Sequence, residues 1–248
     1  MIWQENSNFK GKIVPAVHAW SIKSLDENLQ WMQKFVDSDF ISFGSIVTKN
    51  FSSENHFFGD RQPTKDLIEM LSNAISRTQE LTDFKTHVLG IGSSPLMLNI
   101  IYYLGAESTD SAGARRKAAY GKIVLPGRGE RYLGDGTASF GRNRKSDKKQ
   151  RQQILDELKN SCSCEICRNN PNLLETDWKA RAIHNEHVLK KEVETIQRLM
   201  SQGIDVLERY MDGIFEKSSF NYLYKFAKQK KRYHNISVSY THLTLPTN

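Results

Sequence analysis

The chain has 248 residues, of which 38% are hydrophobic and 25% are charged. These values are typical of a globular protein with a buried core, and they exclude collagen-like and disordered chains. No run of about 18 uninterrupted apolar residues occurs, and the N-terminus lacks the apolar segment of a signal peptide, so we expect a cytoplasmic protein without a membrane span. The three cysteines lie within residues 162–167, a cluster that favours a metal site over a disulfide framework.

The formal net charge of +7 is unevenly distributed along the chain. Residues 1–110 hold 9 Lys and Arg against 13 Asp and Glu, whereas residues 111–248 hold 26 against 15. Within the second part, residues 111–151 hold 12 basic and only 3 acidic side chains. A charge run of this kind is often a solvated face, but it also suits a polyanion, so we expect any nucleic-acid surface to lie C-terminal to Asp110.

Short apolar runs alternate with amphipathic helices in the first 110 residues, which is the pattern of βα units and a parallel sheet. Cap residues mark where the helices begin and end. The predicted strands are residues 13–17, 40–47, 86–91 and 106–109. The predicted cap residues are Ser24 with Glu27 as a capping box, Thr64 as an N-cap, and Ser94, Pro95 and Gly105 bounding a third helix.

Glycines and turns from residue 121 to residue 141 predict a small β excursion after the fourth unit. A basic helix is expected from about residue 146, and two further helices over about 176–201 and 205–215. The last stretch, residues 238–248, resembles a translated sequencing adapter, so we expect a tail that is foreign to the fold. A natural β-prone tail is the alternative.

A metal site is predicted by the spacing Cys162-x-Cys164-x-x-Cys167. His184 on the following helix can complete a tetrahedral shell of three sulfurs and one nitrogen, for which zinc is the first expectation. His187, one helical turn further on, is an alternative fourth ligand on spacing alone, and three unligated thiols are the other alternative. A shell with four protein ligands leaves no open position, so we expect a structural metal.

The C-terminal ends of the four strands carry the other candidates. Active sites of (β/α)8 barrels lie at this rim, and glycines there let a flat ligand approach the backbone. Asp110 is the candidate catalytic carboxylate, although an aspartate at a strand end can equally be a helix cap. The remaining rim positions are His18, Gly44, Ser45, Gly90 and Gly92.

Taken in chain order, these strands, the aspartate with its basic run and the cysteine cluster resemble the tRNA-guanine transglycosylase family. Its members are barrel enzymes with a zinc subdomain that exchange guanine for a 7-deazaguanine. Two stretches resemble the family's base pocket, FISFGSIV (residues 40–47) and HVLGIGSS (residues 87–94). GAESTDSAGARRKAAYGK (residues 105–122) resembles the stretch that bears the nucleophilic aspartate and its arginines. CSCEIC with RAIHN (residues 181–185) resembles the zinc motif and favours His184 over His187.

The resemblance implies an α/β fold in which residues 1–145 form the C-terminal half of a TIM-type barrel, with a zinc-binding helical subdomain over residues 146–237. It also implies a guanine exchange on tRNA or, as in a DNA-modifying branch of the family, on DNA, and a homodimer formed through the zinc subdomain. The structural cofactor would be Zn²⁺, and the partners would be a nucleic acid and a 7-deazaguanine base. The implied residue roles are Asp110 as nucleophile, His18, Gly44, Ser45, Leu89 and Gly90 as base contacts, and Arg115, Arg116 and Lys117 as nucleic-acid contacts.

The sequence also departs from the family pattern. His18, Ala19 and Trp20 replace a glutamine and two glycines, Gly44 and Ser45 replace paired glycines, and Ser111 follows the aspartate. The family's first four strands, which supply a second carboxylate for proton transfer, would precede Met1, so we expect this chain to be a fragment. The rival expectations are a zinc-stabilised nucleic-acid-binding module without catalysis and an unrelated barrel enzyme that acts on phosphorylated small molecules.

Overall fold

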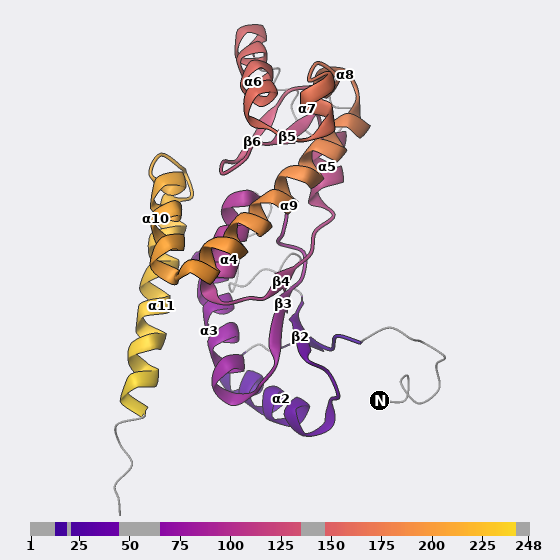
Figure 1. Ribbon diagram of the computed structural model, residues 1–248. Coiled ribbons are helices and arrows are strands. Elements are labelled where there is room, and N and C mark those ends of the chain that lie inside the picture. The colour runs from indigo at the N-terminus through magenta and orange to yellow at the C-terminus, as the bar shows by residue number, and fades with distance from the viewer. Residues whose placement is uncertain (1–12, 19–20, 45–64, 135–146, 242–248) are drawn as a thin grey trace, which may run out of the picture.

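A computed structural model describes residues 13–18, 21–44, 65–134 and 147–241, with side chains as far as residue 231. The described part is an α/β fold with mostly helical content. It contains a four-stranded parallel sheet in the order β1-β2-β3-β4 and a separate antiparallel hairpin, β5-β6 (Figure 1). None of its helices is long and apolar enough to cross a membrane.

The parallel sheet is short, and its strands follow the predicted order. The strands are β1 (Ala16–Val17), β2 (Phe40–Phe43), β3 (Lys85–Val88) and β4 (Ser108–Thr109). Strands β1 and β4 end at the expected residues but begin later, and β3 ends earlier, at Val88, because only these residues pair with a neighbouring strand. Residues 45–47 of the second predicted strand lie outside the described residues. Among the described strands β1 is at the edge, as its place in the sequence predicts.

The helices between the strands follow the apolar periodicity. They are α2 (Ile22–Phe35), α3 (Lys65–Leu81) and α4 (Pro95–Leu104). The capping box of α2 differs from the expectation: Ser21 is the N-cap and Ser24 takes the third helical position, because each hydroxyl accepts a hydrogen bond from the other's backbone N–H. The ends of α4 are as predicted, with Pro95 first and Gly105 in the left-handed region at the end, although the Ser94 side chain makes no cap bond. Thr64 lies outside the described residues.

The described elements of the second half of the chain are helices and one hairpin. After α5 (Gly113–Ala119) come β5 (Lys122–Val124) and β6 (Glu130–Tyr132), which confirm a β excursion. The helices that follow are α6 (Lys148–Ser161), α7 (Glu165–Asn169), α8 (Leu173–Thr176), α9 (Trp178–Gln202), α10 (Ile204–Phe215) and α11 (Asn221–Thr241). Helix α11 continues past residue 238, where we expected the foreign tail to begin, and residues 242–248 lie outside the described part.

Two hydrophobic cores organise these elements. The first joins the parallel sheet and α2–α4 to the C-terminal half of α9 and to α10 and α11. The second joins the β5-β6 hairpin to α6, α7, α8 and the N-terminal half of α9. We call the elements of the first core the sheet module and those of the second core the upper module, which lies at the top of Figure 1. Helix α9 belongs to both cores and runs from the upper module to the sheet module.

Candidate active site and metal centre

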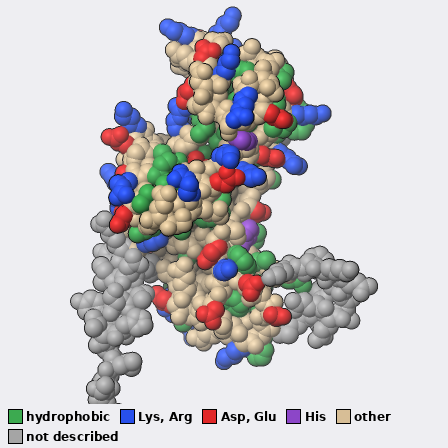
Figure 2. Space-filling view, in the orientation of Figure 1, with side chains coloured by type: hydrophobic (Ala, Val, Ile, Leu, Met, Phe, Trp, Pro, Cys, Tyr) green, Lys and Arg blue, Asp and Glu red, His purple; other side chains and the backbone are tan. Residues whose placement is uncertain are grey.

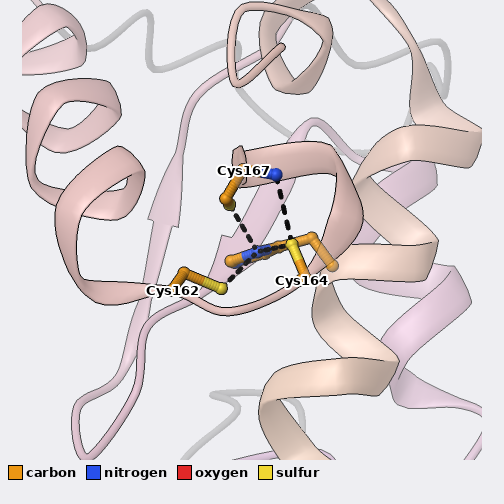
Figure 3. A group of neighbouring side chains, drawn as sticks. Cys162, Cys164 and Cys167 are labelled. Carbon is orange, nitrogen blue, oxygen red and sulfur yellow. Dashed lines mark hydrogen bonds between the residues drawn. The ribbon is translucent and has the colours of Figure 1, made fainter. Parts of the chain in front are cut away.

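Three cysteines and one histidine converge at the base of the upper module. Cys162 follows the end of α6, Cys164 is the N-cap of α7 and Cys167 lies within α7, while His184 lies on α9. All four side chains are buried, and their ligand atoms lie within 4.8 Å of one another. Figure 3 shows the three cysteine side chains pointing toward one another. We call these four residues the metal centre.

The distances between the ligand atoms suit a single tetrahedral ion. His184 Nδ1 lies 3.7 Å from the sulfur of Cys162, 3.6 Å from that of Cys164 and 3.3 Å from that of Cys167. Zinc bonds of about 2.3 Å to sulfur and about 2.1 Å to nitrogen, at a tetrahedral angle, place the sulfur and nitrogen about 3.6 Å apart. His187 is not in the cluster, because its Nε2 lies 3.0 Å from the hydroxyl of Ser163. The geometry thus favours His184, as the motif predicted.

Hydrogen bonds around the metal centre fix the orientation of its histidine. His184 Nε2 lies 2.9 Å from the carbonyl oxygen of Val124, so Nε2 carries the proton and Nδ1 keeps its lone pair for a ligand. The next residue, Asn185, accepts a hydrogen bond from the Val124 N–H and donates to the carbonyl oxygens of Ala114 and Lys122. Two consecutive residues of α9 therefore hold β5 against the metal centre.

Arg181, one turn earlier on α9, holds two short helices in place. Its side chain is 1% exposed, and its guanidinium donates to the carbonyl oxygens of Ala118, Leu174 and Glu175. These carbonyls belong to the last turns of α5 and α8, where a cation is favoured by the helix dipole. The Ala118 oxygen also accepts a hydrogen bond from the Gly121 N–H. In the run RAIHN, His184 thus supplies a ligand, and Arg181 and Asn185 hold neighbouring backbone segments in place by hydrogen bonds.

The electrostatics of the metal centre favour a cation. Hydrogen bonds from Cys162 and Cys167 lower the pKa of Cys164 far below that of an ordinary thiol, whereas hydrogen bonds with Cys162 and Cys164 raise the pKa of Cys167, so Cys164 is the thiol that ionises before Cys167. Burial alone would lower the pKa of His184, yet hydrogen bonds and negative charge from Cys162 and Cys164 raise it to about 9. The cluster therefore stabilises a positive charge at its centre, either as a proton on His184 or as a metal ion.

The second candidate lies where the parallel strands end, a region that we call the strand-end site. The pairing register places Ser42 of β2, His87 of β3 and Ser108 of β4 side by side across the sheet. Asp110 follows β4, and its side chain is 60% exposed. The row is thus polar on a sheet whose alternate residues Ile41, Thr86 and Val88 are fully buried.

Asp110 is tied to the turn after β3. Its Oδ1 accepts a 2.6 Å hydrogen bond from the N–H of Gly90, and its backbone oxygen accepts one of 3.1 Å from Gly92. Gly90 has φ of 82°, a conformation that disfavours side chains, and a Cβ at Gly92 would lie 3.2 Å from the Asp110 backbone oxygen. The two glycines therefore let the turn approach and orient the carboxylate.

Three of the predicted base contacts lie together. A Cβ placed on Gly44 would lie 3.3 Å from the His18 ring and 3.4 Å from the Leu89 side chain, so these two side chains pack closely over the Gly44 backbone. Gly90 contacts Asp110 as described, which brings four of the five predicted residues to one end of the sheet. The fifth, Ser45, lies outside the described residues.

A pocket of about 410 Å³ opens beside Asp110. Its walls come from the turn after β4, from α5 and from α9, and they include Asp110, Arg115, Glu186 and Lys190. Arg115 is exposed and pairs with Glu186 at 3.1 Å, and Arg116 is also exposed. Lys117 differs from its two neighbours, because it is largely buried and binds both Glu130 and the backbone oxygen of Ser93.

A larger cleft of about 1260 Å³ lies between the hairpin turn, α9 and α10. Its deepest acid, Glu192, is 4% exposed and accepts hydrogen bonds from Asn99, Tyr210 and the Gly127 N–H. Because these three donors occupy both oxygens, Glu192 joins the hairpin to α4 and α10 and is not available for chemistry. The exposed carboxylate of Asp110 remains the better candidate.

Several site residues were not predicted from the sequence. His87 stands next to Asp110 across the sheet, and Glu186 and Lys190 of α9 line the Asp110 pocket. His87 could have been found, since it is two residues before Leu89 and points to the same face of the strand. Glu186 and Lys190 could not, because only the packing of α9 on α5 brings them to the pocket.

A comparison of the chain with protein-family models finds no matching family, and a comparison with curated proteins finds no match.

Proposed function

We propose that the protein is a base-exchange transglycosylase that replaces guanine by a 7-deazaguanine in a nucleic acid, through a covalent ester between Asp110 and the sugar. The carrying observation is the Asp110 carboxylate, which is exposed at the end of a parallel strand and oriented by the Gly90 N–H. A carboxylate held in this way can attack C1′ while the base leaves, as the nucleophile of a retaining glycosidase does.

The parallel sheet supports a partial (β/α)8 barrel as the scaffold of this reaction. Its four strands run in sequential order with a helix after each of the first three, and the candidate residues lie at the C-terminal ends of the strands. The proposed base contacts His18, Gly44 and Leu89 lie together at this end, and Gly90, next to Leu89, holds Asp110. A 7-deazaguanine bound there would lie close to Asp110.

The metal centre supports a structural Zn²⁺. Three thiols and one imidazole are a donor set that zinc prefers, and all four ligands come from the protein. When bound, the ion supplies a cross-link between α6, α7 and α9 and takes no part in the exchange. The residues that follow the ligand His184 on α9 connect the metal centre to the pocket. Asn185 donates a hydrogen bond to the backbone of α5, and Glu186 pairs with Arg115 beside the pocket.

Basic residues around the pocket support a nucleic-acid substrate. Arg115 and Lys190 line the pocket from two helices, and Arg116 is exposed on α5. Lysine and arginine at these positions can hold phosphates while the target nucleotide leaves its stack. Figure 2 shows Lys and Arg side chains interspersed with Asp and Glu over the upper module, so the basic charge does not form one uniform face in that view.

The test is incorporation of labelled guanine or 7-deazaguanine into tRNA and, separately, into duplex DNA. Asp110→Asn keeps the side-chain shape but removes the nucleophilic charge, so incorporation and the covalent adduct should both be lost. Nucleic-acid binding through Arg115 and Arg116 should persist and weaken strongly with salt. Near-unchanged turnover by Asp110→Asn would refute the nucleophile.

A second candidate function is nucleic-acid binding without catalysis. The observation that favours it is the fully closed metal centre beside two exposed arginines, an arrangement that needs no chemistry. Binding by the unchanged chain without incorporation into either polymer would favour this candidate.

A further inference from the structure

The base exchange requires a proton to move twice. When the bond between C1′ and the leaving guanine breaks, the base departs with the electron pair and is a poor leaving group unless it receives a proton. When the incoming 7-deazaguanine attacks C1′, its N9–H must lose a proton. The nucleophile cannot serve as this acid, because Asp110 is esterified between the two steps.

Among the described residues, His87 is a titratable side chain that lies next to that carboxylate. Its Nε2 lies 3.6 Å from Asp110 Oδ1. Its other ring nitrogen, Nδ1, lies 2.8 Å from the hydroxyl of Ser108 on the neighbouring strand. The contact with Ser108 therefore orients the ring through Nδ1, and Nε2 faces the side of the sheet where Asp110 stands.

The surroundings of His87 leave its ring accessible. Its side chain is 21% exposed, whereas its strand neighbours Thr86 and Val88 are fully buried. Across the sheet it lies between Ser42 and Ser108 in the pairing register, and both of these are neutral. Asp110 Oδ1 is already held by the Gly90 N–H, so His87 can exchange a proton with a bound base without releasing the carboxylate.

We propose that His87 is the proton-transfer residue of the strand-end site, an assignment that rests on the proposed function. In the first step, the carboxylate of Asp110 forms a bond to C1′, the bond from C1′ to guanine breaks, and the Nε2 proton of His87 moves to a ring nitrogen of the leaving base. In the second step, neutral His87 takes the N9 proton of the incoming base, N9 bonds to C1′ and Asp110 is released. The proton count is unchanged over the cycle, as in acid–base pairs that reverse roles in retaining glycosidases.

The test compares two leaving bases in single-turnover formation of the covalent adduct. His87→Gln keeps a polar side chain of similar reach but has no transferable ring proton. With guanine at the target position, we expect adduct formation to slow by about 10²–10⁴-fold. With 7-methylguanine, which carries a positive charge and leaves as a neutral base without protonation, we expect the variant to react at about the rate of the unchanged chain. His187→Gln, outside both sites, is the matched control.

A second variant covers the case in which 7-methylguanine does not react. His87→Gly leaves space in which an imidazole molecule from solution can replace the missing ring. Added imidazole should restore exchange in the His87→Gly variant but not in the Asp110→Asn variant. A merely structural His87 would slow both leaving bases equally and would not respond to imidazole, and either result overturns the assignment. Exchange at an unchanged rate by His87→Gln overturns it as well. Failure of the unchanged chain to form an adduct with either base overturns the proposed function, and the assignment with it.

Discussion

The metal centre and the strand-end site differ in how far their polar side chains are buried and in how many of their polar atoms have a partner. In the metal centre, all four ligand side chains are buried, each points to one common position, and the free ring nitrogen of His184 is held by a backbone carbonyl. At the strand-end site, the Asp110 carboxylate is 60% exposed, only one of its oxygens is held by a backbone N–H, and a pocket of about 410 Å³ opens beside it.

This difference separates a site built for stability from one that can admit a ligand. Buried donors that satisfy one another hold the chain together and leave no position for a substrate. Partly satisfied donors at the end of a sheet cost stability and gain access. Substitutions in the metal centre should therefore change stability most, and substitutions at the strand-end site should change ligand binding.

Removing the metal centre should unfold the upper module and leave the parallel sheet folded. Cys164→Ser and His184→Ala should lose bound zinc, because the apparent free energy of binding at such sites, on the order of 10 kcal/mol, is also folding free energy. Zinc content by elemental analysis and hydrogen exchange of β5 and α7 provide the measurements. His187→Ala is the control and should keep the metal. Full zinc content in either ligand variant would contradict the assignment.

Arg181 tests whether the hydrogen bonds around the metal centre contribute to stability as its ligands do. Arg181→Met should lower the free energy of unfolding by about 3 kcal/mol, since it leaves three buried carbonyl oxygens without their charged donor. Gly134→Ala approaches the same position from the other side, because its Cβ would lie 2.2 Å from the Arg181 guanidinium and 2.5 Å from the Glu175 oxygen. Urea unfolding measures the stability of both variants, and unchanged midpoints would show that the hydrogen bonds of Arg181 do not contribute to stability.

Glycine substitutions at the strand-end site should affect function more than stability. Gly44→Ala places a Cβ 3.3 Å from the His18 ring and 3.4 Å from the Leu89 side chain, so these two side chains must shift by a few tenths of an ångström. We expect a loss of stability within about 1 kcal/mol but weaker binding of the incoming base, seen as a higher KM with little change in kcat. Gly129→Ala, which has open space around its Cβ, is the control. Equal effects of the two substitutions on KM would remove Gly44 from the base pocket.

The smallest expected effect lies outside both sites, in the ion pair that joins α2 to α3. Hydrogen bonds from Arg77 hold the pKa of Asp26 below its ordinary value of 3.8, and the two side chains are 30% and 24% exposed. Because the folded pKa is lowered, the pair stabilises the protein above about pH 4, and this contribution disappears as the pH falls through the folded pKa. For a partly exposed pair it is about 0.5 kcal/mol.

Unfolding midpoints at pH 7 and pH 3 measure the contribution of this pair. Arg77→Met should lower stability at pH 7 and have less effect at pH 3, whereas Lys23→Met, whose 3.9 Å pair with Glu27 is exposed, should change little at either pH. A loss that is equal at both pH values would show that Arg77 acts by packing instead of charge.

The sequence predicted the elements whose signals are local. The Ser94, Pro95 and Gly105 pattern bounded α4 correctly, and the spacing of the three cysteines with His184 identified the metal centre. The capping box of α2 was placed three residues late, because Ser21 and Ser24 are both competent caps and only the backbone at Ser21 decides between them.

Contacts between distant segments could not be predicted in the same way. His87 meets Asp110 only because β3 and β4 pair in one register, and a shift of one residue would turn it to the buried face. The ion pair between Lys117 and Glu130 could not be predicted either, because Glu130 comes from a hairpin strand whose pairing the sequence does not encode locally. The role of α9 in two cores depends likewise on packing.

The position of α9 in both cores also constrains how the chain folds during synthesis. The sheet module includes Ile196 and Leu199 of α9 and Leu207, Met211 and Phe215 of α10 in its core. A ribosome that has made only the strands has not yet supplied these side chains, and at about 5–20 residues per second the wait from β4 to α10 lasts several seconds. During that interval the apolar faces of α3 and α4 lack their final cover, so the nascent chain offers a binding surface to chaperones.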